Sequence, residues 1–265
     1  MRRPLLCVLV SFVATSCSFS DDNGDGGPLG GSRTVEGTVV DFESGMPISG
    51  AASVSTSGLS PVPTVTSQGA SFTITGVPEN SAFQILASAP TSHRPTFSDA
   101  VVVETDDLRD VKAPAVSEAF LQILTAGFVV TPSAARGILL ARIVDDRGMP
   151  KAGVAAASLA LAGAGTSPPR FLSATMLPDS NATVTSTSGW VVFFEVPPGV
   201  AALGQSQSGT VTLDMPVSPV SAGTVTIAHI HATDGAPVLP KNVSFRNQVV
   251  PIFGPKASGG RGCEA

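Results

Sequence analysis

Short stretches in which apolar and polar residues alternate predict that this chain is rich in β-strands. Residues 71–75 place Phe72 and Ile74 on one face of a strand and hydroxyl side chains on the other. Residues 211–215 alternate in the same way, as expected for a strand with one face in water. Residues 190–196 are apolar at nearly every position, which predicts a central strand covered on both faces.

One helix is predicted between two strand-rich regions. Ser117 can cap its first turn, and Glu118 suits the positive end of the helix dipole. Gly127 is expected to end it. Its apolar residues share one face: Phe120, Leu121 and Leu124. We expect this helix to pack on the edge of a β-sandwich and to limit hinge motion between the two regions.

An internal repeat organises the strands. The sequence Gly-Met-Pro that starts at Gly45 recurs at Gly148, 103 positions later, and a strand start at Gly69 recurs at Gly189, 120 positions later. The second copy therefore carries about 17 surplus residues, the difference between the two offsets, around 158–187. This insertion is predicted either to cover an edge of its own sandwich or to present an apolar surface to a partner.

The two copies resemble the carboxypeptidase regulatory-like domain, a prealbumin-like (transthyretin-like) β-sandwich. The corresponding residues are 37–41, 50–51, 69–72 and 77–78 in the first copy and 221–226 in the second. Gln68 replaces an acidic residue that is usual in that family, and Asn80 stands where glycine is common. The resemblance covers about residues 34–116 and 136–232. It implies an all-β chain of two tandem immunoglobulin-like or prealbumin-like sandwiches with one short linking helix.

Composition agrees with a folded chain of many short strands. Hydrophobic residues make up 43% and charged residues 13% of the 265 positions, with 27 glycines, 22 prolines and no tyrosine. The net charge is −5, and it becomes −7 if a leader that holds Arg2 and Arg3 is removed. No basic cluster provides a footprint for nucleic acid, so no nucleic-acid partner is expected.

The N-terminus has the pattern of an export signal. Two arginines precede an apolar stretch too short to span about 30 Å of hydrocarbon, and small residues then lead to Cys17. This pattern resembles the lipobox of bacterial lipoproteins, although Ala14 stands where leucine is usual. The resemblance implies cleavage after residue 16, acyl chains such as palmitate on Cys17, and an exported protein anchored to the membrane by lipid. The alternative is an ordinary secretory peptide cleaved nearby.

Two further features bear on anchoring. Ser18 follows the cysteine where aspartate would retain a Gram-negative lipoprotein in the inner membrane, so the lipoprotein resemblance implies delivery to the outer membrane. With Cys17 lipidated and Cys7 in the leader, Cys263 is the one remaining thiol and no intramolecular disulfide can form.

The expected segments are a signal peptide (1–16), a lipidated cysteine with a flexible tether (17–33), a first sandwich (34–116), a helix and linker (117–135), a second sandwich (136–232, insertion about 158–187) and a tail (233–265).

Motifs for catalysis are not found in the sequence. Residues 204–208 lack the last glycine of a G-x-S-x-G elbow, and neither a phosphate-binding loop nor a dinucleotide fingerprint occurs. Acidic pairs such as Asp41 with Glu43 lie at predicted strand ends, where carboxylates usually accept hydrogen bonds from turn amides. We therefore expect no enzyme activity, no catalytic residue and no cofactor.

A few residues are weak candidates for metal binding or ligand contact. His229 and His231 alternate on one predicted strand, and Asp234 is close enough in sequence to join them around a zinc or copper ion. The alternative is a set of polar residues at a strand end. Trp190 is a core residue or, alternatively, a ligand platform. Three residues match the first half of a calcium loop within a tether that otherwise looks solvated: Asp21, Asn23 and Asp25.

The function expected from the sequence is a non-enzymatic structural or adhesion module of the cell envelope. An alternative is a carbohydrate- or protein-binding surface component that uses the loop 158–187. A third alternative is a metal-dependent enzyme that uses His229 and His231.

Replacing the lipidation cysteine tests the anchor. Cys17→Ser should release or mislocalise the protein, because several acyl chains at about 0.8 kcal/mol per buried CH₂ would be lost. Cell fractionation measures the release and mass spectrometry identifies the mature N-terminus. Cys263→Ser is the matched control and should stay in the membrane fraction. An unmodified mature N-terminus at another position would contradict the prediction.

Overall fold

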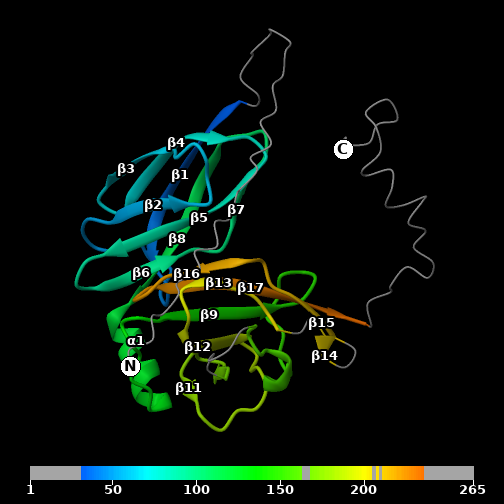
Figure 1. Ribbon diagram of the computed structural model, residues 1–265. Helices are drawn as coiled ribbons and strands as arrows, with labels where there is room; N and C mark the ends of the chain where they lie inside the picture. The colour runs from blue at the N-terminus through cyan, green and yellow to red at the C-terminus, as the bar shows by residue number, and fades with distance from the viewer. Residues whose placement is uncertain (1–30, 163–167, 205–206, 209–210, 236–265) are drawn as a thin grey trace, which may run out of the picture.

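Two β-rich units lie end to end in the computed structural model, which describes residues 31–162, 168–204, 207–208 and 211–235 (Figure 1). Strands β1 to β8 form the N-terminal unit, and strands β9 to β17 form the C-terminal unit. Helix α1 (Glu118–Phe128) links them. The chain is therefore an all-β sandwich protein with one short helix in its described part, as the alternation of residues predicts.

The N-terminal unit is a sandwich of two layers. One layer has the order β3–β4–β1–β8, and in the other β5 pairs with β2, β6 and β7. The first layer is β1 (Ser32–Asp41), β3 (Thr64–Gln68), β4 (Ser71–Pro78) and β8 (Leu108–Ser117). The second is β2 (Ser53–Ser57), β5 (Ser81–Ala89), β6 (His93–Phe97) and β7 (Val101–Val103).

Alternation explains the core between these layers. Phe72 and Ile74 of β4 are buried, as predicted, and they meet Val35 of β1 and Ile85 of β5. Gly37 permits this packing, because a Cβ atom there would lie 2.4 Å from the ring of Phe72. The polar positions of β1, β3 and β4 consequently face away from the core.

The C-terminal unit is built on one large sheet, in the order β11–β10–β12–β9–β17, with β15 and β14 continuing beside β17. Its strands are β9 (Gly137–Val144), β10 (Arg170–Leu172), β11 (Pro178–Asp179), β12 (Trp190–Val196), β14 (Gln207–Ser208), β15 (Val211–Asp214) and β17 (Val225–Asp234). The opposing layer is small, a two-stranded sheet of β13 (Gly199–Ala201) and β16 (Ser218–Val220). A 3-10 turn, η1 (Ala156–Ser158), leads into the insertion.

Both faces of the central strands are buried, as predicted for residues 190–196. Val191 and Phe193 of β12 join the core of their own sandwich. Trp190, Val192 and Phe194 of the same strand join a second core on the opposite face. This second core, which we call the seam, also holds residues of β9, β17 and α1: Ile138, Leu140, Val225, Ile227, Phe120, Leu121, Leu124 and Phe128.

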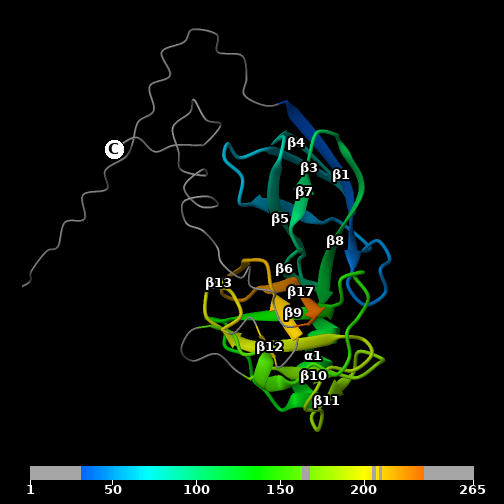
Figure 2. The same cartoon turned by 90° about the vertical axis from the view of Figure 1, so that its right-hand side faces the viewer.

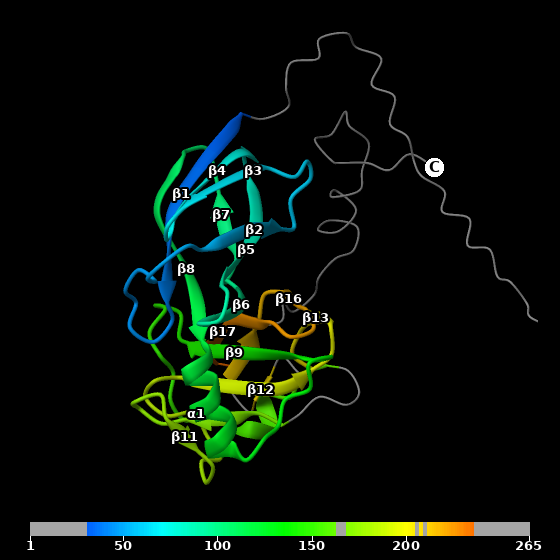
Figure 3. The same cartoon turned by 90° about the vertical axis from the view of Figure 1, so that its left-hand side faces the viewer.

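Helix α1 covers a sheet face, so the expectation of packing on a sandwich edge is wrong (Figure 3). The apolar residues of both faces of β12 explain the difference, because the second face needs a cover that β13 and β16 do not supply. Ser117 caps the helix as predicted, accepting a hydrogen bond from the backbone N–H of Phe120 at 3.0 Å.

The predicted end of α1 at Gly127 is also wrong. The helix continues to Phe128, and Val129 forms its left-handed C-cap at φ 54°. Gly127 has a packing role instead, because a Cβ atom there would lie 2.5 Å from the ring of Pro178. This glycine therefore marks a close approach between α1 and β11 and does not mark the helix terminus.

The described part of the insertion folds back on its own unit. Strand β10 pairs with the outer edge of β12, and Phe171 and Leu172 are 2% and 0% exposed. The backbone N–H of Ala156 donates to the carbonyl of Thr183 at 3.0 Å, which closes the base of the insertion. Edge cover, one of the two predicted arrangements, is therefore the arrangement found here.

The two units are joined by a shared sheet and by the seam. Strand β17 pairs in parallel with β6 through Val225 with Thr96 and Thr226 with Phe97. Phe42, at the end of β1, packs against the seam, with its ring centroid 5.0 Å from Trp190 and 5.7 Å from Phe120. These contacts couple the units more closely than a linking helix alone would.

Several predicted features lie outside the described residues. They are the signal peptide (1–16), Cys17, the candidate calcium ligands Asp21, Asn23 and Asp25, most of the tether (17–33), and the tail beyond residue 235 with Cys263. Arg33, expected in the tether, lies within β1. Among the described residues, no helix is long and apolar enough to cross a membrane. The division into segments stays a prediction.

Removing a side chain from the seam tests its contribution to stability. Leu124 is fully buried there, so Leu124→Ala should lower the free energy of unfolding by about 2–5 kcal/mol through lost burial and a residual cavity. Ile123 on the same helix is 45% exposed, and Ile123→Ala should cost less than about 1 kcal/mol. Urea unfolding followed by circular dichroism measures both. Equal losses would contradict this packing.

Candidate functional site

Polar side chains gather where the two units meet, around the turn between β5 and β6. The Nε2 atom of His93 lies 3.1 Å from Oδ2 of Asp41, and its Nδ1 atom lies 2.9 Å from Oγ of Ser92. This Asp–His–Ser chain has no local signal in the sequence, because Asp41 and His93 are 52 residues apart. Only the adjacency of Ser92 and His93 was visible beforehand, and adjacency alone does not indicate a shared hydrogen-bond chain.

The environment of Asp41 keeps this carboxylate ionised. Burial by itself raises the pKa of Asp41, but hydrogen bonds from the backbone and hydroxyl of Ser44 and from His93 outweigh it, so the pKa lies below its ordinary value. The donor–acceptor distances from Ser44 are 2.9 Å for its N–H and 2.7 Å for its hydroxyl. Asp41 therefore orients the imidazole of His93 and also closes the turn that follows β1.

The surroundings of Ser92 show that this series of hydrogen bonds bridges different elements of the fold. Its backbone N–H donates to the carbonyl of Ala89 at 3.2 Å, and its own carbonyl accepts from the N–H of Glu118 at 2.9 Å. Its side chain is exposed. A cavity of about 170 Å³ beside α1 is lined by Arg94 and Glu118 and does not include Ser92. The Asp41–His93–Ser92 chain thus ties β1 to the turn before β6, and that turn holds the start of α1.

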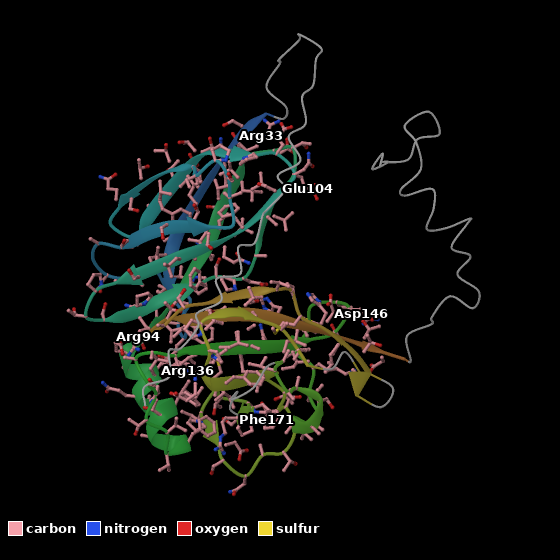
Figure 4. All side chains as sticks on the ribbon, in the orientation of Figure 1. Arg33, Arg94, Glu104, Arg136, Asp146 and Phe171 are labelled. Carbon is pink, nitrogen blue, oxygen red and sulfur yellow. The ribbon has the colours of Figure 1, made fainter. Side chains whose placement is uncertain are left out.

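An ion pair strengthens the same junction. Arg94 donates two hydrogen bonds to Glu118, from Nε at 2.6 Å and from a terminal nitrogen at 2.7 Å. Figure 4 shows Arg94 at the level where the two units meet. The hydrogen bond with Glu118 raises the pKa of Arg94, and the same bond lowers the pKa of Glu118 against the opposing effect of burial. Strand β6 is thereby fixed to the first turn of α1.

The candidate metal ligands each have different surroundings. His229 places Nδ1 2.5 Å from Oδ2 of Asp99, in the segment after β6, and so bridges the two units. Asp234 pairs with Lys151, whose Nζ lies 2.5 Å from Oδ2. His231 is exposed. The described residues contain no group of three or more His, Cys, Asp or Glu side chains arranged to hold a metal ion.

Trp190 lies in the core, and the ligand-platform alternative is not supported. Its exposed fraction is 8%. Phe42 meets the indole edge-on, at an interplanar angle of 81°, and the guanidinium carbon of Arg142 lies 5.7 Å from the ring centroid. The ring therefore contributes to packing at the seam through both an aromatic and a cationic neighbour.

The acidic residues at the repeated turns act as turn caps. Asp145 accepts hydrogen bonds from the backbone N–H groups of Met149 and Arg147, each at 2.9 Å, and these bonds lower its pKa. Asp41 does the equivalent with Ser44 in the first copy. Neither acid forms a close carboxylate pair with its neighbour, so the described geometry matches the turn-cap alternative.

Comparisons with known proteins assign no family to this chain. No protein-family model and no curated protein matches the chain. Among solved structures, the Bacillus anthracis TIE protein is 12% identical with a TM-score of 0.26, and the match covers 77% of this chain and 34% of that protein. The minor pilin GBS52 of Streptococcus agalactiae is 14% identical, with a TM-score of 0.25 and coverage of 79% and 100%.

A shaft pilin, spaA of Lactobacillus rhamnosus GG, matches at 11% identity and a TM-score of 0.24, with coverage of 79% of this chain and 100% of that one. TM-scores of this size assign neither a family nor a function to the chain. The present chain spans about a third, 34%, of the length of the TIE protein. The carboxypeptidase regulatory-like resemblance and the lipobox resemblance stay predictions.

Because of the Arg94–Glu118 pair, we expect the free energy of unfolding to depend on pH. Because the folded-state pKa of Glu118 lies below its ordinary 4.5, the pair stabilises the fold above that pH and loses its contribution as the pH falls through the folded-state pKa. Glu118→Gln should therefore destabilise the protein near pH 7, and its difference from the wild type should shrink as the pH falls through the folded-state pKa of Glu118. Thermal unfolding across this range measures the difference.

Glu104→Gln is the matched control for this experiment. Glu104 is exposed, and its side chain makes no ion pair among the described residues. Its stability difference from the wild type should stay small at every pH. A Glu118→Gln difference that grows as the pH falls would overturn the assignment.

Proposed function

We propose that the chain is a lipid-anchored protein of the cell envelope whose two sandwich units act as one rigid, non-enzymatic module. The observation that carries this proposal is the parallel pairing of β17 with β6, which continues the sheet of one unit into the other. The seam around Phe42 and the junction formed by Arg94, Glu118, Asp99 and His229 reinforce it. A rigid module holds its two ends at a fixed distance and orientation from each other.

The direction of the chain supports this geometry. Strand β1 begins at the end of the N-terminal unit that lies away from the C-terminal unit (Figure 2). A lipid on Cys17, followed by a tether into β1, places the N-terminal unit next to the membrane. The C-terminal unit then lies outermost, where it can meet other envelope components. In a Gram-negative cell, aspartate at position 18 would retain the protein in the inner membrane. Because this position is Ser18, the protein is expected to reach the outer membrane.

The alternative of a receptor that binds through residues 158–187 has less support. Phe171 and Leu172, two of the apolar residues in that stretch, are used to cover the edge of β12, and Figure 4 shows Phe171 within the C-terminal unit. Leu177 remains 52% exposed and Val184 40% exposed. A metal-dependent enzyme built on His229 and His231 has no supporting observation, because His229 pairs with Asp99 and His231 faces solvent separately.

Distance measurements between the units test the rigid module. Spin labels at Val62→Cys and Val217→Cys report across the junction, because these side chains are 82% and 64% exposed and lie one in each unit. The lipidated protein in detergent, with Cys263→Ser, should give one narrow distance distribution by double electron–electron resonance. Phe42→Ala should broaden it, because the aromatic contacts at the seam are lost.

Ile123→Ala is the matched control, since Ile123 lies on the outer side of α1. It should leave the distance distribution unchanged. A broad or two-peaked distribution in the unmutated junction would show independent units and would overturn the proposal.

A further inference from the structure

A polar face covers the outer side of the N-terminal unit, on the layer β3–β4–β1–β8. Every outward position is polar within residues 34–38 of β1, 64–68 of β3 and 71–75 of β4, and all but two of these residues carry a hydroxyl. We call this set the hydroxyl face: Thr64, Thr66, Gln68, Ser71, Thr73, Thr75, Thr34, Glu36 and Thr38. Their inward neighbours form the core, so this face is the solvent side of the sandwich.

The sheet register arranges these side chains in rows. Thr66 pairs with Thr73, and Thr73 pairs with Glu36. The next row runs from Gln68 through Ser71 and Thr38 to Lys112. Neighbours in a row are about 4.5–5.5 Å apart at Cβ. The result is a regular array of groups that both donate and accept hydrogen bonds.

A β-bulge hollows this array between β1 and β8. Two residues of β8, Arg109 and Asp110, oppose the single residue Glu36, and the register shifts there. Asp110 has φ 56°, a conformation that residues other than glycine seldom adopt. Bulges are frequent beside binding sites because they redirect side chains. A depression of about 460 Å³ lies at this point.

The depression continues into a second one. The first is lined by Gly37 and Phe72 and by the polar residues Glu36, Thr38, Ser71, Thr73, Arg109 and Asp110. The second, about 230 Å³, shares Ser71, Phe72 and Thr73 and adds Thr66, Ser67 and Gln68. Together they cross all four strands of the layer, a width of about 14 Å at 4.7–4.9 Å per strand.

The two depressions together form one groove, and its charge and chemistry limit which ligands it can bind. Arg109 offsets one of the two acids in the groove, Glu36 and Asp110. Lys112, which lies outside the lining, offsets the other, so this part of the face has no net charge to attract a polyanion or a polycation. None of these four side chains makes an ion pair or a side-chain hydrogen bond among the described residues. The face also lacks the exposed aromatic anchors on which protein interfaces depend.

We propose that the hydroxyl face binds a neutral oligosaccharide. Sugar hydroxyls donate and accept hydrogen bonds, as threonine, serine and glutamine do. The charged groups that line the groove at the bulge, Glu36, Arg109 and Asp110, can also bond to sugar hydroxyls. This site lies on a different unit from the loop 158–187 and does not depend on lipidation. Weak single sites of this kind gain strength when many copies are displayed on one surface.

Titration with neutral tetrasaccharides tests the proposal. The probes are cellotetraose, chitotetraose and maltotetraose, added to the ¹⁵N-labelled mature chain with Cys17→Ser. At least one should shift the amide signals of Glu36, Thr38, Ser71, Thr73 and Asp110 in a saturable way. The double variant Arg109→Ala with Ser71→Val should weaken that binding about tenfold or more, since each lost polar contact contributes about 1 kcal/mol.

A matched double variant controls for general effects of the substitutions. Arg147→Ala with Ser55→Val makes the same changes at exposed positions of the C-terminal unit and of the opposite layer, on β2. It should leave the affinity within about twofold. No shift with any of the three probes, shifts confined to other residues, or binding of a heparin tetrasaccharide in place of the neutral ones would each overturn the proposal. None of these results bears on the anchor or on the rigidity of the junction.

Discussion

Burial of both faces of one sheet is the constraint on which the rest of this structure depends. The strands β9, β12 and β17 are apolar on each side, so one side forms the core of the C-terminal sandwich and the other must be covered. Helix α1 and Phe42 provide the cover; α1 is the link between the units, and Phe42 belongs to the N-terminal unit. The seam therefore links the packing of the second unit to the position of the first.

The polar contacts at the junction add direction to this apolar attachment. Apolar packing is not directional, whereas the Arg94–Glu118 pair and the His229–Asp99 pair fix particular strands beside particular neighbours. The network around Asp41 lies close to the same place and orders the turn from which Phe42 extends. Packing and hydrogen bonding thus support a single arrangement of the two units, and the hydroxyl face stays on the side of the molecule that neither unit covers.

Local patterns predicted much of the fold, and long-range contacts account for what they missed. Alternation identified β4 with Phe72 and Ile74 inward, the apolar run identified β12, and Ser117 identified the start of α1. The register between β6 and β17 could not be read, because parallel pairing between distant strands leaves no local signal. The partners of His229 and His93 were missed for the same reason. The bulge at Asp110 was also missed, since nothing in the sequence marks a left-handed aspartate.

The parallel pairing of the first and last strands in each unit has a mechanical consequence. Strand β1 runs beside β8 from Val35 with Leu108 to Asp41 with Ala115, and β9 runs beside β17 in the same sense. The chain enters each unit at one end of such a pair and leaves at the other. Tension along the chain therefore shears a whole ladder of hydrogen bonds at once and does not open them one by one. Because the two units follow one another along the chain, each of them bears the full pulling force.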